Sequence, residues 1–442
     1  MRKKVILWLA AMLCMLLTLL SACGANNVSS GNPQPGTTQH GSARLYVLDG
    51  YTPPGASTTG NQRIVAFQPE SAHPGALVTL PAGLMSFDHQ RIYTATAQGG
   101  HTTIAIFDTQ SGRSIRTFSI PGSYSTSERG YATPVSSPDG RWLALRQQGT
   151  ASDATTIALV DTQAAKLVKT FHLAGTFALD AIAANGGMIY LLQYPNSGSE
   201  HYDVRAFDAQ AGQILPGTIV DKTEINEKMQ GTALTRQMAA DGSFAYTLYI
   251  NTAINKAFVH ILPLYNEPGG PPLARCLDLP VGHSASLLHY YTLALSADGT
   301  TLYAANAALG TAVKIGLDHN QSTVFDINIA TTGRFNPGNV VTTSSDRTRM
   351  LHNGAVLSPD QKTLYVAGER GIWVIDTATL NVRAHYLTQQ TFTGVAISAD
   401  GRTLYAVDPT TGITLIDAAA GQVRQVTKSP AQAPWGIEWI SS

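Results

Sequence analysis

The chain has 442 residues, and its 29 basic and 29 acidic side chains leave no formal net charge. Only 13% of the residues are charged, so the sequence lacks the basic field that holds nucleic acid, and we expect no nucleic-acid partner. Gly is frequent, Thr, Val, Ile and Tyr recur, and segments with a helical period are hard to find. This composition predicts an all-β chain with many tight turns.

The N-terminus has the layout of a secretory signal. Three basic residues at positions 2–4 precede an uncharged apolar run over residues 5–20, and small residues follow. A run of about 16 residues is short for a membrane-spanning helix, which needs roughly 20. We therefore predict a signal peptide over residues 1–22.

The tetrapeptide at residues 20–23, Leu-Ser-Ala-Cys, resembles the lipobox of bacterial lipoproteins. In that family the Cys becomes the first residue of the mature chain and carries a thioether-linked diacylglyceryl group, which implies that Cys23 is lipidated. An ordinary cleaved signal with an incidental Cys is the alternative. Residues 23–42 are predicted to form a flexible tether, because a segment rich in Asn, Ser, Gly, Pro, Thr and Gln cannot bury enough apolar surface to fold. The resemblance implies a protein attached to the cell envelope by lipid, on the cell membrane or the outer membrane, and facing away from the cytoplasm.

The cysteines do not predict a disulfide. Cys14 lies in the signal and Cys23 takes the lipid, which leaves Cys276 alone in the mature body. We interpret Cys276, within an alternating stretch, as a small buried hydrophobic residue rather than a nucleophile.

A sequence pattern that recurs along the chain is the main evidence for the predicted fold. In each unit an acidic or amide residue is followed five positions later by a Tyr. The pairs are Asp88/Tyr93, Asn185/Tyr190, Asp241/Tyr246, Asp298/Tyr303, Asp360/Tyr365 and Asp400/Tyr405, with a variant at Asp139-Gly140-Arg141-Trp142-Leu143. Asp-Gly between two alternating apolar runs is typical of a hairpin turn, so we interpret these Asp residues as turn formers rather than catalytic groups.

Each unit continues with a third strand, a turn and a fourth strand, and four short strands in roughly 40 to 60 residues are typical of a propeller blade. The Tyr strands number eight, centred on residues 46, 93, 143, 190, 246, 303, 365 and 405. The first unit lacks an inner strand, whereas residues 435–440 form an inner strand with nothing after it. We therefore predict an all-β β-propeller over residues 43–442, with eight four-stranded blades (seven as the fallback) and a ring closed by the C-terminal strand.

The last three units resemble the YVTN-type propeller repeats of prokaryotic surface and exported proteins, which are similar to WD40 propellers. The likeness rests on residues 302–306, on 364–368 through 374–379, and on 404–407, and covers about a third of the chain closely. Such repeats specify fold better than function. The related lactonase-like propellers are enzymes, but no segment carries a catalytic cluster of acidic, His and Arg residues that could be transferred.

A propeller site usually lies at the mouth of the central channel, where the innermost strands begin. Eight residues before each turn residue stand Leu80, Tyr131, Phe177, Ala233, Tyr290, His352 and Phe392, and Trp435 lies near the equivalent place in the last strand. Aromatic or His side chains dominate this position. They form either an amphipathic rim for a flat ligand or the packing between blades, and we favour packing. The candidate ligand-binding residues are Tyr131, Phe177, His289, Tyr290, His352, Asn353, Phe392 and Trp435.

His289 and His352 would need a third ligand to hold a metal, and no H-x-x-x-H, C-x-x-C or EF-hand pattern occurs. Gly-x-Ser-x-Gly, phosphate-loop and dinucleotide patterns are also absent from the sequence, so we assign no metal, cofactor or catalytic residue. The favoured function is a monomeric, lipid-anchored binding or scaffold module for a protein, peptide or glycan partner. The alternative is an extracytoplasmic hydrolase or lactonase-like enzyme, and a redox or cofactor propeller is a third, weaker hypothesis.

Overall fold

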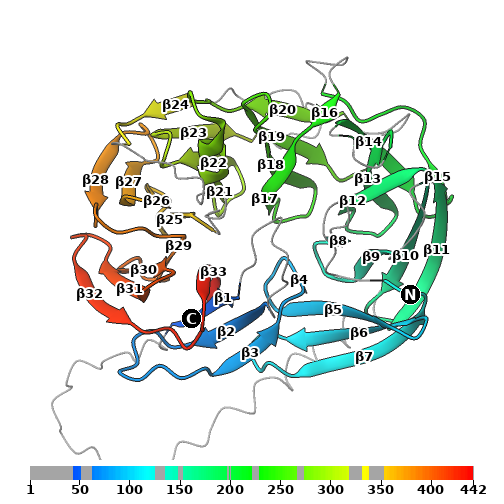
Figure 1. Ribbon diagram of the computed structural model, residues 1–442, viewed down its shortest axis with the longest axis horizontal. Coiled ribbons are helices and arrows are strands. Elements are labelled where there is room, and N and C mark those ends of the chain that lie inside the picture. The colour runs from blue at the N-terminus through cyan, green and yellow to red at the C-terminus, as the bar shows by residue number, and fades with distance from the viewer. Residues whose placement is uncertain are drawn as a thin grey trace, which may run out of the picture. The chain divides into compact units, whose positions relative to one another are not determined.

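The computed structural model describes residues 43–50, 62–124, 135–147, 153–196, 199, 201–221, 228–265, 273–317, 331–337 and 353–441. These residues form eight antiparallel sheets arranged as a β-propeller (Figure 1). The predicted fold class and the number of blades are confirmed. The predicted signal and tether, with Cys23, lie outside the described residues, as do Tyr131 and His352.

Blade one joins the two ends of the propeller. From the inside outward it contains β33 (Pro434–Ser441), β1 (Arg44–Asp49), β2 (Arg63–Phe67) and β3 (Val78–Pro81). Tyr46 of β1 lies opposite Trp439 of β33, and their rings stack with centroids 3.9 Å apart. The C-terminal strand therefore closes the ring, as predicted.

Blades two to four follow in chain order, each listed from its inner to its outer strand. Blade two is β4 (Leu84–Met85), β5 (Arg91–Gln98), β6 (His101–Asp108) and β7 (Ser114–Pro121). Blade three is β8 (Val135–Ser136), β9 (Trp142–Arg146), β10 (Ala154–Asp161) and β11 (Lys166–Ala174). Blade four is β12 (Thr176–Ile182), β13 (Met188–Tyr194), β14 (His201–Asp208) and β15 (Gln213–Ile214), and a fifth strand, β16 (Met229–Gln230), pairs with β14.

Blades five to eight complete the ring. Blade five is β17 (Thr232–Met238), β18 (Phe244–Asn251), β19 (Lys256–Pro263) and β20 (Arg275–Asp278), followed by the 3-10 helix η1 (Ala285–Tyr290). Blade six is β21 (Tyr291–Leu295), β22 (Thr301–Asn306), β23 (Thr311–Gly316) and β24 (Thr331–Arg334). Blade seven is β25 (Ala355–Leu357), β26 (Thr363–Gly368), β27 (Gly371–Asp376) and β28 (Val382–Tyr386). Blade eight is β29 (Gly394–Ile397), β30 (Thr403–Asp408), β31 (Gly412–Asp417) and β32 (Val423–Thr427).

The repeated Asp residues form turns between the first and second strands. In five blades a Ser two positions earlier donates its hydroxyl to the Asp carboxylate, as Ser296 does to Asp298 at 2.6 Å. The same Ser oxygen accepts the N–H of Thr301 at 2.9 Å, which closes the turn. The other pairs are Ser86/Asp88, Ser137/Asp139, Ser358/Asp360 and Ser398/Asp400. These hydrogen bonds account for the repeated carboxylates structurally, as the sequence indicates.

A glycine in one of these turns has two constraints. Gly140 has a φ of +67°, which side chains rarely adopt. A Cβ atom at this position would also lie 2.1 Å from the Tyr93 hydroxyl of the preceding blade. Position 140 in blade three therefore favours Gly both for the turn and for the approach of the neighbouring Tyr.

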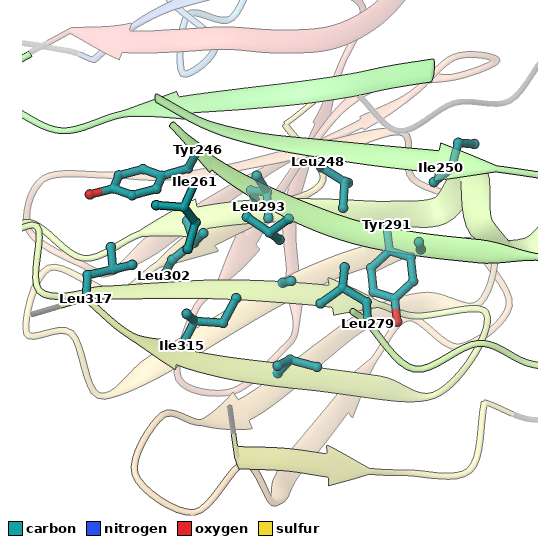
Figure 2. Packing of buried hydrophobic residues seen from close by; sticks show 14 of the residues in the cluster. Tyr246, Leu248, Ile250, Ile261, Leu279, Tyr291, Leu293, Leu302, Ile315 and Leu317 are labelled. Carbon is teal, nitrogen blue, oxygen red and sulfur yellow. The ribbon is translucent and has the colours of Figure 1, made fainter. Parts of the chain in front are cut away.

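The core lies between neighbouring sheets. Figure 2 shows this packing between blades five and six, where Leu248 and Ile261 of one blade face Leu293 and Ile315 of the next. Each fully buried aliphatic side chain stabilises such an interface by about 1.5–3 kcal/mol. Because neighbouring blades pack against each other in this way around the ring, one ring accommodates the described residues from 43 to 441.

Candidate functional site

The inner strands of the ring begin on one face, which we call the start face and which includes residues 387–393 and 428–433. The opposite face carries the Ser-x-Asp turns, and we call it the turn face. The register of the repeat correctly places Phe177, Tyr290 and Phe392 at or just before an inner strand. Leu80 is an exception, because it belongs to the outer strand β3. A very short connection, residues 82–83, leads from β3 into blade two, so a fixed count of eight residues reaches back into blade one.

The aromatic residues at the strand starts are buried. Phe177, Tyr290 and Phe392 have 1%, 2% and 0% of their surface exposed. The Tyr290 hydroxyl donates to the Glu369 carboxylate of blade seven, and the Phe392 N–H donates to the Gly368 carbonyl at 3.0 Å. These contacts connect one blade to another, which is the packing role that the sequence favours. Ligand contact by these residues stays a prediction.

The other candidates at the start face are partly exposed. His289 lies in η1, Trp435 in β33 and Asn353 just before β25. The Asn353 amide donates to the carbonyls of Ile437 and Glu438, at 2.8 and 3.2 Å. Asn353 has a φ of +52°, a conformation that Asn tolerates better than most residues. Its side chain therefore joins blade seven to the closing strand.

Asp180 and Arg236 connect the inner strands of blades four and five. The Arg236 guanidinium donates to both the carboxylate and the backbone carbonyl of Asp180, and its Nε donates to Thr247 at 2.7 Å. Both inner strands carry a register shift at this level, at Leu179/Ala181 and at Ala233/Thr235. A β-bulge redirects side chains in this way. The repeat pattern did not predict this pair, although a single Asp within the apolar strand β12 is a signal that the sequence offers.

Buried polar rings lie beside this ion pair. Tyr249 is 6.4 Å from Tyr202 and 6.0 Å from His260 between ring centroids. Burial raises the pKa of both Tyr hydroxyls and lowers the pKa of His260 to about 4. All three side chains are therefore uncharged at neutral pH. Because Arg236 and Asp180 neutralise each other, we assign no acid or base to this cluster.

A groove of about 780 Å³ lies between blades one and eight. One wall is the segment 72–75, from the connection between β2 and β3, and the other is residues 425–432, from β32 and the segment after it. Thr427 donates its hydroxyl to the Pro69 carbonyl at 2.8 Å, and this hydrogen bond fixes the two walls to each other. The Tyr405 hydroxyl donates to Glu70 at 2.8 Å and fixes the same connection to blade eight. We call this feature the blade 1/8 groove.

The lining of the blade 1/8 groove is polar with one exposed apolar side chain. His73, Gln425, Lys428 and Gln432 supply hydrogen-bonding groups, and among the described residues no Asp or Glu lines the groove. Val426 also lines it and is 54% exposed. β32 is the edge strand of blade eight, so one side of its backbone is paired with no other strand among the described residues. This arrangement can bind an extended chain through backbone hydrogen bonds and one apolar contact.

The described part of the chain contains neither a metal-binding group of His, Cys, Asp and Glu side chains nor a membrane-spanning helix. No group of three or more His, Cys, Asp or Glu side chains there lies close enough to hold a metal ion. Among the same residues no helix is long and apolar enough to cross a membrane. The apolar run at residues 5–20 lies outside this part.

No protein-family model matches the chain, and no curated protein matches it. Among solved structures it is similar to apo AztD from Citrobacter koseri, with 13% identity, 89% of this chain and 96% of that chain covered, and a TM-score of 0.49. It is also similar to a candidate 6-phosphogluconolactonase from Bacteroides fragilis, with 16% identity, coverage of 80% and 98%, and a TM-score of 0.39. The β-propeller domain of Cps50 (Swd1) from Myceliophteria thermophila shares 11% identity, with coverage of 76% and 96% and a TM-score of 0.41. Likenesses at this level assign no activity to the chain.

Proposed function

We propose that this propeller is a binding module that takes up an extended peptide segment of a partner protein along β32, in the blade 1/8 groove. The observation that carries the proposal is the groove itself, about 780 Å³ in volume and walled by an edge strand. Ligand sites usually measure about 300–1,000 Å³. Edge strands present backbone N–H and C=O groups that a second extended chain can pair with. A peptide is therefore favoured over a glycan within the predicted class of partners.

The chemistry of the groove favours binding over hydrolysis. Hydrolysis by general acid and base catalysis generally needs a carboxylate, His or similar group held against a partner group of shifted pKa. Among the described residues that line the groove, His73 is the one imidazole, and no carboxylate accompanies it there. Lys428 adds a positive charge, which suits a peptide with an acidic residue near its contact with Val426.

The second part of the proposal is the location. We propose that Cys23 carries the lipid predicted from the lipobox, and that residues 23–42 tether the propeller to the outer face of a membrane. The layout of residues 1–42 supports this part.

Selection from a random peptide display library tests the peptide proposal. The full chain is the bait, and the enriched peptides are synthesised and titrated by fluorescence anisotropy. Val426→Lys should weaken binding by about 10-fold or more, because it removes the apolar contact and places a second cation beside Lys428. The matched control is Val168→Lys on β11, an outer strand of blade three where Val168 is 45% exposed.

Equal affinity of the selected peptides for the two variants would overturn the groove assignment. Enrichment on a glycan array with no enriched peptide would overturn the choice of peptide. Steady turnover of lactone or ester substrates that is lost in the His73→Ala variant would overturn the non-catalytic function.

A further inference from the structure

The connection between blades four and five departs from the repeat. Residues 215–231 add the strand β16, which pairs with β14 so that Met229 lies opposite Tyr202. Asp221, in the same connection, forms a parallel bridge with Ala274 of blade five. Its carboxylate accepts the N–H of Cys276 at 2.6 Å. The connection therefore places Met229 against the outer strand of the next blade.

A row of polar side chains crosses blade five toward Met229. In register, Arg236 lies opposite Thr247, Thr247 opposite His260, and His260 opposite Cys276. Side chains directly opposite each other in antiparallel strands share one face and have Cβ atoms about 4.5–5.5 Å apart. His260 is thus the direct neighbour of Cys276 within the interface between blades four and five.

Two sulfur atoms approach each other at the outer end of this row. Cys276 Sγ lies 3.6 Å from Met229 Sδ. Two sulfur ligands at about 2.3 Å from one tetrahedral metal ion would be separated by about 3.8 Å. A cavity of about 20 Å³ borders both residues, together with Phe258 and Lys256. That volume suffices for one water-sized occupant.

The imidazole of His260, opposite Cys276, has one ring nitrogen without a hydrogen-bond partner among the described residues. His260 is 1% exposed, and this nitrogen is its Nδ1. A buried polar atom without a partner is rare and calls for an explanation. Burial also keeps this ring neutral, which is the form that binds metals.

We propose that the interface between blades four and five binds one soft monovalent metal ion, of the Cu(I) class, through the Cys276 thiolate, the Met229 thioether and the His260 imidazole. Binding replaces the proton of the Cys276 thiol, which passes to water, and the metal ion arrives already in the monovalent state. The site is separate from the blade 1/8 groove and does not depend on the peptide proposal.

The donor set and the charges select the ion. Thiolate and thioether sulfur favour Cu(I), whereas carboxylate and water suit harder ions such as Mg²⁺ and Ca²⁺. Lys228, Lys256 and the Asp221 carboxylate line the cavity, and Lys256 also pairs with Asp278 at 3.5 Å. The two ammonium groups outnumber the single carboxylate in this lining, which favours the thiolate, and a monovalent ion on that one thiolate leaves a neutral centre.

Anaerobic titration with Cu(I) tests the site. The full chain carries Cys14→Ser and Cys23→Ser, so that Cys276 is its only thiol, and affinity is measured by competition with a chromogenic Cu(I) chelator. One ion per chain is expected. Cys276→Ser should abolish this binding, and Met229→Leu should weaken it by about 10-fold or more. Met238→Leu is the matched control, because Met238 packs in the same interface core but lies opposite Ala245, two positions along β17 from Arg236 and its row of polar side chains.

X-ray absorption on the Cu(I)-loaded parent chain makes the test independent of variant folding. Two sulfur scatterers and one nitrogen scatterer support the site. A spectrum with one sulfur, tighter binding of Zn²⁺ than of Cu(I), or equal affinities for Met229→Leu and Met238→Leu would overturn it.

Discussion

The Tyr405 hydroxyl donates a hydrogen bond of 2.8 Å to the Glu70 carboxylate, across the boundary where blade eight meets blade one. Equivalent Tyr residues also reach the following blade. Tyr46 lies 3.4 Å from the Thr109 carbonyl, and Tyr365 lies at the same distance from the Ala418 carbonyl. In these three blades the repeat Tyr connects one blade to the next, and at the ring closure this contact involves a charged acceptor.

Removing the Tyr405 hydroxyl should loosen the ring closure. Tyr405→Phe should lower the free energy of unfolding by about 1.5–3 kcal/mol, the range for a hydrogen bond to a charged group. Tyr365→Phe is the control and should lose less, because its 3.4 Å contact to a neutral carbonyl is long. Urea unfolding of the three chains measures both values. Equal losses would contradict a special role for Glu70.

Breaking the ion pair between blades four and five should be costly. Asp180 is 4% exposed, so Asp180→Ala leaves the Arg236 charge largely desolvated and should lower the free energy of unfolding by about 2–4 kcal/mol. Adding Arg236→Met to this variant should recover part of the loss. A double-mutant cycle measures the coupling, and strictly additive losses would show that the two groups do not interact.

Acid should weaken the first blade through Asp49. Burial alone raises the pKa of this carboxyl, but hydrogen bonds from Ala433 and Arg63 outweigh burial and hold the pKa below its ordinary value of 3.8. Between the pKa of Asp49 in the folded chain and its value of 3.8 in the unfolded chain, the unfolded chain binds more protons. The stability that Asp49 contributes is therefore fully present above pH 3.8 and is lost as the pH falls through the pKa of the folded chain. The stability difference between the parent and Asp49→Asn should therefore shrink in acid. A difference independent of pH would contradict this assignment.

Cys23→Ala should separate the anchor from the propeller. If Cys23 carries the lipid, the variant should lose membrane attachment and appear in the medium or periplasm, because no second acylation site is predicted in the tether or the propeller. Fractionation with an antibody to the propeller measures this distribution. Ser21→Thr, which keeps Cys23, is a control that should stay attached. Retention of Cys23→Ala in the membrane fraction would contradict lipidation.

The architecture could be predicted because the repeat carries its own register. A turn residue followed five positions later by a Tyr, as in Asp298 and Tyr303, marks a turn and a strand in six of the eight units. The unpaired strand at residues 435–440 indicated how the ring closes. The same regularity limited the site prediction. Phe177 and Phe392 share a register position because each fills the same gap between blades, so periodicity alone does not separate packing from binding.

The candidate sites arise where the repeat is broken. The walls of the blade 1/8 groove come from residues 72–75 and 425–432, which are distant in sequence and meet only when the ring closes. Met229 approaches Cys276 through the extra strand β16, and no spacing motif encodes that contact. Both features depend on pairings between blades, which a single sequence does not specify.

Hydrogen–deuterium exchange with and without a selected peptide tests the central claim most directly. Pairing of the peptide with β32 should slow amide exchange over residues 423–432 and over the opposite wall, residues 68–77, because the new strand supplies hydrogen-bond partners to the edge. Residues 387–393, which precede the inner strand of blade eight and do not line the groove, should exchange at an unchanged rate. Protection of residues 387–393, with no change over residues 423–432, would contradict the account.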